Sequence, residues 1–367
     1  MHWRGRVFQL KLKPVCCGTS AWDRPKQCAS LITLLLGCCM LVFLHVLISS
    51  EFEDEAAYFS SLSLPEEDSK LPQMGIVLME NLPVTGTPRM PKRIHQTWKS
   101  DEIPHSLTEW VKSWTKNHPD WEYWLWTDKS ARHLISDRHP SFLQTYDNYP
   151  HNIQRADALR YIVLYEFGGV YADLDMESLR PLDRLAWKYS CFLGQEPYAH
   201  PILDTNTHTL VINAIMACQP GHPFMKMVVD SLPDFAHMWS LFDATGPHFL
   251  SYVYKKYMRE NQQLSPTHED WVYLTPAEYF YPNRDPDKFS YFYRQCKNYE
   301  QLNPLQRAAC HNLKKTPLEE KRMALAFTNH HWVHTYLFSV KVSLRQPVPM
   351  REIVPEMKLY PEDAPVK

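Results

Sequence analysis

One segment, residues 153–175, constrains the fold of this chain more than any other. Apolar residues recur at helical spacing over residues 153–167, and the pair Gly168-Gly169 then provides a helix stop signal. Residues 170–172 follow as a short apolar run typical of a buried strand, and Asp173 comes directly after it. This order of elements predicts an α/β layered fold, in which ligands gather at the carboxyl ends of the strands.

The rest of the chain supports the same fold class. Further strands are predicted at residues 93–98, 122–126, 191–194 and 210–218 and around Tyr273 and Tyr279, and helices at 106–116, from Thr127 or Asp128 to 135, 224–232 and 247–259. No glycine-rich phosphate loop of the P-loop or dinucleotide type is present. A group of tryptophans is interpreted as core in preference to a sugar-stacking platform: Trp110, Trp114, Trp121, Trp124 and Trp126.

The main chemical signal is the pair of carboxylates in Asp173-Leu174-Asp175. Two carboxylates one residue apart can hold a hard cation such as Mg²⁺ or Mn²⁺ against a diphosphate. The alternative is a purely structural role for these aspartates, as a helix cap or in a salt bridge. A carboxylate at the end of a buried strand costs free energy unless its charge is compensated, which favours the metal site. A second pair with the same spacing, Asp285 and Asp287, lies among Pro and Asn and is predicted to be a solvated turn.

Charged residues at the start of the helix that precedes the strand form a second candidate group. Asp157 is either a surface charge favoured by a helix N-terminus or a carboxylate that accepts hydrogen bonds from sugar hydroxyls. Arg155 or Arg160 would pair with phosphate in the functional interpretation. The residues alone leave both interpretations open.

The N-terminal part predicts a membrane anchor. Residues 29–50 contain no Asp, Glu, Lys or Arg, and they are numerous enough to cross a bilayer as one helix, whereas a cleaved signal peptide is the less favoured alternative. Basic residues precede this run and acidic residues follow it, so the N-terminus is expected in the cytoplasm and the remainder in the secretory lumen. The expected organisation is a cytoplasmic tail (1–28), a transmembrane helix (29–50), a stem (51–90), a catalytic domain (91–340) and a C-terminal tail (341–367).

The positions of the cysteines and the net charge indicate which modifications and partners to expect. Four cysteines follow the predicted span, which permits two disulfides; Cys296 and Cys310 are the nearest pair, but the spacing does not determine the connectivity. Cys16, Cys17 and Cys28 are either palmitoylated or plain thiols. The net charge of -2 provides no basic field for a nucleic acid, so no such partner is expected.

The motifs at residues 94–98, 155–161 and 168–175 together resemble glycosyltransferase family 32, the group with the DXD sugar-binding region. Within it, the sequence is most similar to the mannosyl inositol phosphorylceramide synthase type, which transfers mannose from GDP-mannose to a ceramide lipid. The resemblance extends from about residue 91 to 336. It implies a GT-A fold (a nucleotide-sugar-binding α/β sandwich), Mn²⁺ or Mg²⁺ dependence, retention of the anomeric configuration, and a lipid-linked or glycan acceptor. Together with the predicted anchor, it leads us to expect a single-pass type II protein of the Golgi or ER membrane.

The resemblance also implies roles for individual residues. The implied catalytic residues are Asp173, Asp175 and Asp157, and the implied donor-binding residues are His95, Gln96, Arg155, Asp157, Tyr171 and Asp173. The implied acceptor side is Thr245, Gly246 and Pro247. The metal set is Asp173, Asp175 and a histidine assigned here to His331, although His330 and His334 lie in the same stretch.

Other functions remain as alternatives. The enzyme could be a galactosyl- or other hexosyltransferase acting on glycolipid or glycoprotein, or the chain could bind sugar nucleotides at the membrane without turnover. An aspartate-nucleophile phosphohydrolase also places D-x-D after a buried strand. That class needs Thr or Val two residues after the second Asp, where this chain has Glu177.

Overall fold

The computed structural model describes residues 81–315, 324–335 and 346–363, together with Met40. The chain divides into two units, residues 1–59 and 60–367, and every element described below lies in the second. The predicted transmembrane segment, residues 29–50, lies outside the described residues except for Met40. Among the residues that are described, no helix has the length and apolar character needed to cross a membrane.

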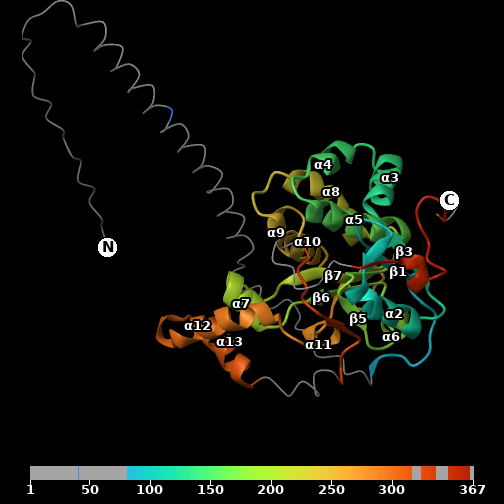
Figure 1. Ribbon diagram of the computed structural model, residues 1–367. Coiled ribbons are helices and arrows are strands. Elements are labelled where there is room, and N and C mark those ends of the chain that lie inside the picture. Colours follow the sequence, from blue (N-terminus) through green and yellow to red (C-terminus); the bar gives the residue numbers. More distant parts are fainter. Residues whose placement is uncertain (1–39, 41–80, 316–323, 336–345, 364–367) are drawn as a thin grey trace, which may run out of the picture. The chain divides into compact units, whose positions relative to one another are not determined.

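A six-stranded sheet forms the centre of the body (Figure 1), in the order β3-β1-β4-β7-β6-β8. Its strands are β1 (Arg93–Thr97), β3 (Glu122–Trp126), β4 (Gly169–Ala172), β6 (Cys191–Gln195), β7 (Val211–Cys218) and β8 (Tyr273–Leu274). Strand β1 is parallel to β3 and β4, and β6 is parallel to β8, whereas β7 runs antiparallel to β4 and β6. The predicted α/β class is therefore confirmed, with one reversed strand in an otherwise parallel sheet.

Helices cover both faces of this sheet (Figure 1). One face carries α3 (Asp128–Arg138), α4 (Leu143–Asn148), α5 (Asn152–Phe167), α8 (Pro223–Phe235), α9 (Leu241–Ala244) and α10 (Pro247–Glu260), and the other carries α2 (Thr108–Asn117), α6 (Asp183–Lys188) and α11 (Ala277–Phe280). Strand β4 shows why two layers form. Tyr171 packs in the first core, while Val170 and Ala172 pack in the second, because successive side chains of a strand point to opposite faces.

Shorter elements complete the body. Two small sheets pair β2 (Glu102–Pro104) with β10 (Pro347–Pro349), and β5 (Met176–Ser178) with β9 (Thr328–His330). Helix α7 (Ala199–Thr205) packs with α12 (Phe289–Lys297) and α13 (Pro304–Lys315) around a separate small core. The remaining short helices are 3-10 turns at His105–Leu107, Pro286–Lys288 and Tyr299–Gln301, and α15 (Met350–Ile353).

Glycine 169 is needed where α5 gives way to β4. Its φ is +105°, and a Cβ there would lie 2.6 Å from the carbonyl oxygen of Arg93 on the neighbouring strand. The left-handed conformation and the close approach of β1 both favour glycine. The predicted glycine stop thus also allows β4 to enter the sheet beside β1.

Three expectations differ from the structure. Tyr279 lies in the helical turn α11 and not in a strand, and this turn buries Tyr279 and Phe280 side by side in the second core. The expected C-terminal tail packs onto the body, where the ring of Tyr360 stacks on that of Trp126 at 5.7 Å. Leu82, expected in the stem, is 2% exposed and belongs to the second core.

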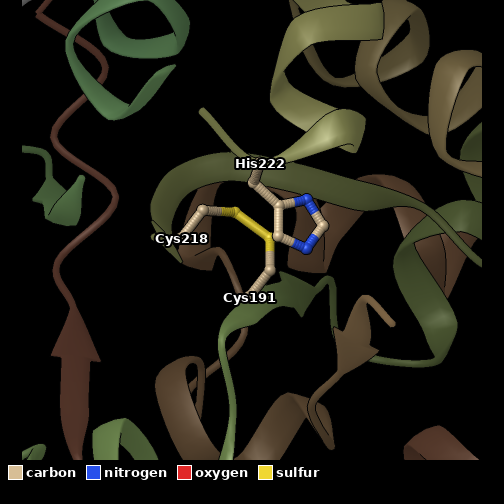
Figure 2. Close-up of side chains that lie close together, drawn as sticks. All are labelled: Cys191, Cys218 and His222. Atoms are coloured by element: carbon tan, nitrogen blue, oxygen red, sulfur yellow. A yellow bond between two sulfur atoms is a disulfide. The ribbon is translucent and has the colours of Figure 1, made fainter. Parts of the chain in front are cut away.

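Two disulfides join the four cysteines that follow residue 50. Cys296 and Cys310 connect α12 to α13, and Cys191 and Cys218 connect β6 to β7. Figure 2 shows His222 beside the second bond. The ring of His222 is already engaged, since Nδ1 accepts from the N–H of Phe224 at 3.1 Å and Nε2 lies 3.3 Å from the carbonyl oxygen of Glu269. His222 therefore caps the start of α8, and the two cysteines are joined in a disulfide. This group is thus structural and is not a metal site.

Candidate active site

A cavity of about 590 Å³ lies at the carboxyl end of β4. Its wall is built from the segment after β4, the first turn of α5, the start of β7, the α9–α10 junction, the turn Pro286–Lys288 and the segment after β9. Because β7 is reversed, its first residues lie at the same edge of the sheet as the end of β4. The cavity thus occupies the place where an α/β sheet binds ligands.

Three side chains in this cavity form a candidate metal site. One possible ligand atom from each of Asp173, Asp175 and His330 lies within 4.8 Å of the others. Two carboxylates and one imidazole are a donor set that suits a divalent cation such as Mn²⁺. The two carboxylates come from the segment after β4, and the histidine comes from β9, which pairs with β5 immediately downstream. The residues present therefore fit the divalent metal that the motif implies.

Asp175 is held in its charged form. Burial opposes ionisation, but the His330 imidazole 3.3 Å away and the N–H of Val333, which donates to Oδ2 at 2.9 Å, outweigh it and lower the pKa of Asp175 to about 2. The same contact raises the pKa of His330, because the negative charge of Asp175 outweighs the burial of the ring. A metal bound here would therefore compete with a proton for His330.

Asp173 is connected to a buried arginine. Burial raises the pKa of Asp173, while Nη1 of Arg160, 3.3 Å from its Oδ1, opposes that rise. Tyr171 donates its hydroxyl to the same oxygen at 2.7 Å, and the Arg160 guanidinium lies 4.9 Å from the centre of the Tyr171 ring. Tyr171 is fully buried, so it positions Asp173 and does not itself face the cavity.

Asp157 is the second carboxylate that Arg160 contacts, at 3.0 Å. Its other partners are the amide of Asn213 and the hydroxyl of Thr245, which both donate at 2.9 Å. Burial raises the pKa of Asp157 to about 6 in spite of these contacts. The structure thus excludes the surface-charge interpretation of Asp157, which is 3% exposed and lines the cavity.

The expected metal histidine, His331, does not join the two aspartates. Its Nε2 lies 3.0 Å from Oε2 of Glu177, and its ring stacks on Trp110 at 4.0 Å. The side chains of His330 and His331 project in different directions because they are consecutive on an extended segment. His330, and not the expected His331, therefore lies beside Asp173 and Asp175.

Replacing His330 by Gln is expected to weaken Mn²⁺ binding by about tenfold or more, since a nitrogen donor beside Asp175 is lost. His331→Gln is the matched control and is expected to leave the affinity within about twofold, because its ring contacts Trp110 and Glu177 instead. Titration of the full chain with Mn²⁺, followed by electron paramagnetic resonance, measures both. A larger loss for His331→Gln would contradict this assignment.

His95 and Gln96 do not line the cavity. The His95 ring is fully buried, with Nε2 2.9 Å from the carbonyl oxygen of Gly168, while Nδ1 accepts from the indole N–H of Trp126 at 3.1 Å. Gln96 donates to the carbonyl oxygen of Asp173 at 3.0 Å. Both residues therefore support the backbone of the site from within the sheet, which differs from the expected donor contact.

Acid is expected to weaken folding through His95. Burial lowers its pKa to about 4. Below pH ~6.5 the unfolded chain gains a proton that the folded chain refuses, so this residue removes up to about 3 kcal/mol of the free energy of unfolding between pH ~6.5 and ~4. Urea unfolding across this range should show a shallower fall for His95→Gln than for wild type. The exposed His133→Gln is the control, and a slope unchanged by His95→Gln would show that the histidine is not held neutral.

The remaining predicted residues divide between cavity and scaffold. Gly246 and Pro247 line the cavity at the start of α10, whereas Thr245 is fully buried and contacts Asp157. Arg155 does not line it; Nη1 donates to the carbonyl oxygen of Tyr149, and Nη2 donates to Asn152. Arg160, the other candidate of the sequence interpretation, occupies the central position instead.

The second D-x-D pair is not a solvated turn, contrary to the sequence interpretation. Asp285 is 1% exposed and its Oδ2 lies 3.0 Å from Nε2 of His334, while Asp287 is exposed. Asp285, Asp287 and His334 line the same cavity as the first pair. Pro and Asn neighbours predicted a turn correctly, but a local pattern carries no information on what covers it.

Comparison with known proteins finds similarity to glycosyltransferases. Residues 104–192 match the family described as glycosyltransferase sugar-binding region containing DXD motif. The chain is 33% identical over 237 residues to inositol phosphoceramide mannosyltransferase 2 of Schizosaccharomyces pombe, covering 63% of this chain and 64% of that protein. It is 38% identical over 192 residues to mannosyl phosphorylinositol ceramide synthase SUR1 of Saccharomyces cerevisiae, covering 50% of this chain and 47% of that protein.

A solved structure, the PaToxG glycosyltransferase, covers 77% of this chain and 97% of its own, with 15% identity and a TM-score of 0.39. The chain spans about half to two thirds of the length of the curated relatives named here. The match over residues 104–192 includes Asp157, Asp173 and Asp175. It confirms the resemblance that the motifs predicted.

Proposed function

We propose, for a chain whose residues 104–192 match the DXD-containing sugar-binding region of glycosyltransferases, that it is a retaining, metal-dependent mannosyltransferase. The donor is GDP-mannose, and the acceptor is a glycolipid of the inositol phosphoceramide kind. The observation that carries the proposal is the convergence of Asp173, Asp175 and His330 on one cavity. The names of two relatives, inositol phosphoceramide mannosyltransferase 2 and mannosyl phosphorylinositol ceramide synthase, support the choice of mannose as the sugar and of the glycolipid as the acceptor.

The cation of this proposal is Mn²⁺, with Mg²⁺ as the alternative. An imidazole ligand suits Mn²⁺ better than Mg²⁺, which prefers carboxylate and water oxygens. When bound, the cation would supply positive charge that stabilises the diphosphate as it leaves the sugar. Asp173, Asp175 and His330 would hold it.

The other residues of the site hold the metal ligands and the substrates in position. Arg160 contacts both Asp157 and Asp173, and so holds the two carboxylates in a fixed arrangement. We assign Asp157 to the donor sugar, whose hydroxyls can donate to its remaining lone pairs. The acceptor side is assigned to Gly246 and Pro247, where the backbone comes close to the cavity, and Thr245 holds Asp157 in place.

The proposal includes the setting of the enzyme. Residues 29–50 form an N-terminal membrane anchor, and the body lies in the lumen of the Golgi or ER. The body has the GT-A arrangement, supported by the parallel-rich sheet with its site at the end of β4. The two disulfides support an oxidising compartment.

A donor panel tests this function. The full chain, purified in detergent with Mn²⁺ or EDTA, is incubated with GDP-mannose, UDP-galactose and UDP-glucose, and release of the nucleoside diphosphate is measured. We expect metal-dependent release of GDP from GDP-mannose that is faster than release of UDP from either of the other donors. Preference for a UDP-sugar would show that the transferred sugar is another hexose and not mannose. Folded protein that releases no nucleoside diphosphate from any donor would contradict the enzyme proposal.

A further inference from the structure

Helix α12 presents aromatic and basic side chains to solvent. Phe289, Tyr291 and Tyr293 are 40%, 40% and 50% exposed, and Arg294 and Lys297 are exposed as well. We call this set the α12 surface. Single exposed apolar residues are common on proteins, but three aromatic rings on a nine-residue helix are a concentration that marks an interaction surface.

The inner side of α12 is attached to the body by packing and by a disulfide. Phe292 is buried and packs in the small core with α7 and α13, and Cys296, one turn later, forms the disulfide to Cys310. Residues four apart lie on one side of a helix, so Phe289, Tyr293 and Lys297 share a stripe next to this inner side. The α12 surface is therefore held on a packed and covalently joined base.

Charge points to the kind of partner. Residues 286–315 contain six Lys or Arg against two Asp or Glu, a net charge of +4, whereas the whole chain carries -2. No ion pair is found for Arg294 or Lys297 within the part of the chain that the structure describes. Arg294 and Lys297 give the α12 surface itself a charge of +2, which complements an anionic partner. Tyr side chains beside Lys and Arg are typical of elements that lie at a membrane interface.

The α12 surface adjoins the active site. Lys288 lines the cavity, and α12 begins at the next residue, Phe289. Phe242, on another wall of the cavity, is also 40% exposed. A lipid acceptor of the proposed function must bring its headgroup to the cavity while its chains remain in the bilayer.

From these observations we propose that the α12 surface docks on the surface of a bilayer that carries anionic headgroups, and thereby holds the cavity at headgroup level. The inference rests on the proposed lipid acceptor. Phe289, Tyr291 and Tyr293 lie among the headgroups, and Arg294 and Lys297 contact their phosphates or carboxylates. Bilayer contact is thus a property of the folded body in addition to any anchor nearer the N-terminus.

Hydrogen exchange of the full chain tests the proposal directly. The protein is compared in nanodiscs of phosphatidylcholine with and without phosphatidylserine, and in detergent micelles. Backbone amides of residues 289–297 are expected to exchange about tenfold more slowly in the anionic nanodiscs. The double variant Tyr293→Ser/Lys297→Glu should lose this protection, while Lys129→Glu, a charge reversal at an exposed position of α3, should keep it.

Activity separates this inference from the proposed function. Metal-dependent hydrolysis of GDP-mannose by the same preparations should be unchanged in Tyr293→Ser/Lys297→Glu, which also shows that the variant folds. Transfer to inositol phosphoceramide in the bilayer should fall about tenfold. Equal exchange of residues 289–297 in all three environments would overturn the docking proposal and leave the enzyme proposal intact. Protection in detergent that rises with protein concentration would assign the surface to a second copy of the chain, and would overturn it too.

Discussion

Asp175→Asn is expected to reduce mannosyl transfer on the order of a thousandfold, which corresponds to about 4 kcal/mol of transition-state stabilisation. Asp175 is held ionised, with a pKa lowered to about 2, and the amide of Asn removes its charge at nearly constant shape. Mn²⁺ affinity should fall together with the rate. Initial rates at saturating Mn²⁺ and GDP-mannose, together with a Mn²⁺ titration, measure both effects.

The second D-x-D pair offers a matched control. Asp287→Asn removes one carboxylate from the same cavity, where Asp285, Asp287 and His334 form a second group with ligand atoms within 4.8 Å of one another, apart from Asp173, Asp175 and His330. It is expected to change the rate by less than about fivefold, an exposed charge being worth little. If Asp287→Asn were as damaging as Asp175→Asn, the metal assignment to the first pair would be wrong.

Arg160→Met is expected to lower the free energy of unfolding by about 3–5 kcal/mol. The side chain of Arg160 is 4% exposed and lies between Asp157 and Asp173, at 3.0 and 3.3 Å. Its removal leaves the buried carboxylate of Asp157 and the partly exposed carboxylate of Asp173 without their cation. It also leaves the carbonyl oxygen of Asn213 without its donor. Urea unfolding monitored by circular dichroism, in the absence of divalent metal, gives the loss.

A second measurement distinguishes charge from packing in Arg160→Met. Because bound Mn²⁺ supplies positive charge to Asp173, the metal should recover part of the lost stability in the variant. Arg132→Met is the control, since Arg132 and Asp147 form an exposed pair at 2.7 Å that is worth at most about 1 kcal/mol. A loss for Arg160→Met no larger than that of Arg132→Met would show that Asp157 and Asp173 do not depend on this arginine.

Local patterns were sufficient for the centre of the fold and for the two aspartates. The helix, glycine stop and strand at residues 153–172 are consecutive, and each step has its own signal, so the position of Asp173 at the end of a strand followed directly. The four-residue strand β4 is short, but β1 and β7 enclose it on both sides. Its all-apolar composition reflects that burial.

The histidine could not be chosen from spacing alone. His330 faces the aspartates because β9 pairs with β5, where His330 lies opposite Met176. These two residues are 154 positions apart in the sequence. A shift of one residue in that register would bring His331 to the site instead. Sequence reasoning had no means to determine this register.

Asn213 was missed for a related reason. It lies in the all-buried strand β7, where an amide among apolar residues gives no functional signal, and its contacts to Asp157 and Tyr161 depend on the sheet order. The reverse error occurred at His95, which the sequence interpretation put at the end of the first strand, but which lies in the middle of β1 and points into the core. In both positions the direction of a side chain, and not its residue type, decides the role.

The most direct test of the central proposal is the product of a single reaction. The full chain in nanodiscs containing inositol phosphoceramide is incubated with GDP-mannose and Mn²⁺, and the lipids are analysed by mass spectrometry and glycosidase digestion. The expected product carries one α-linked mannose on the inositol headgroup, and it is absent with EDTA and absent in Asp175→Asn. Folded protein that binds Mn²⁺ and GDP-mannose but forms no glycosylated lipid would contradict it.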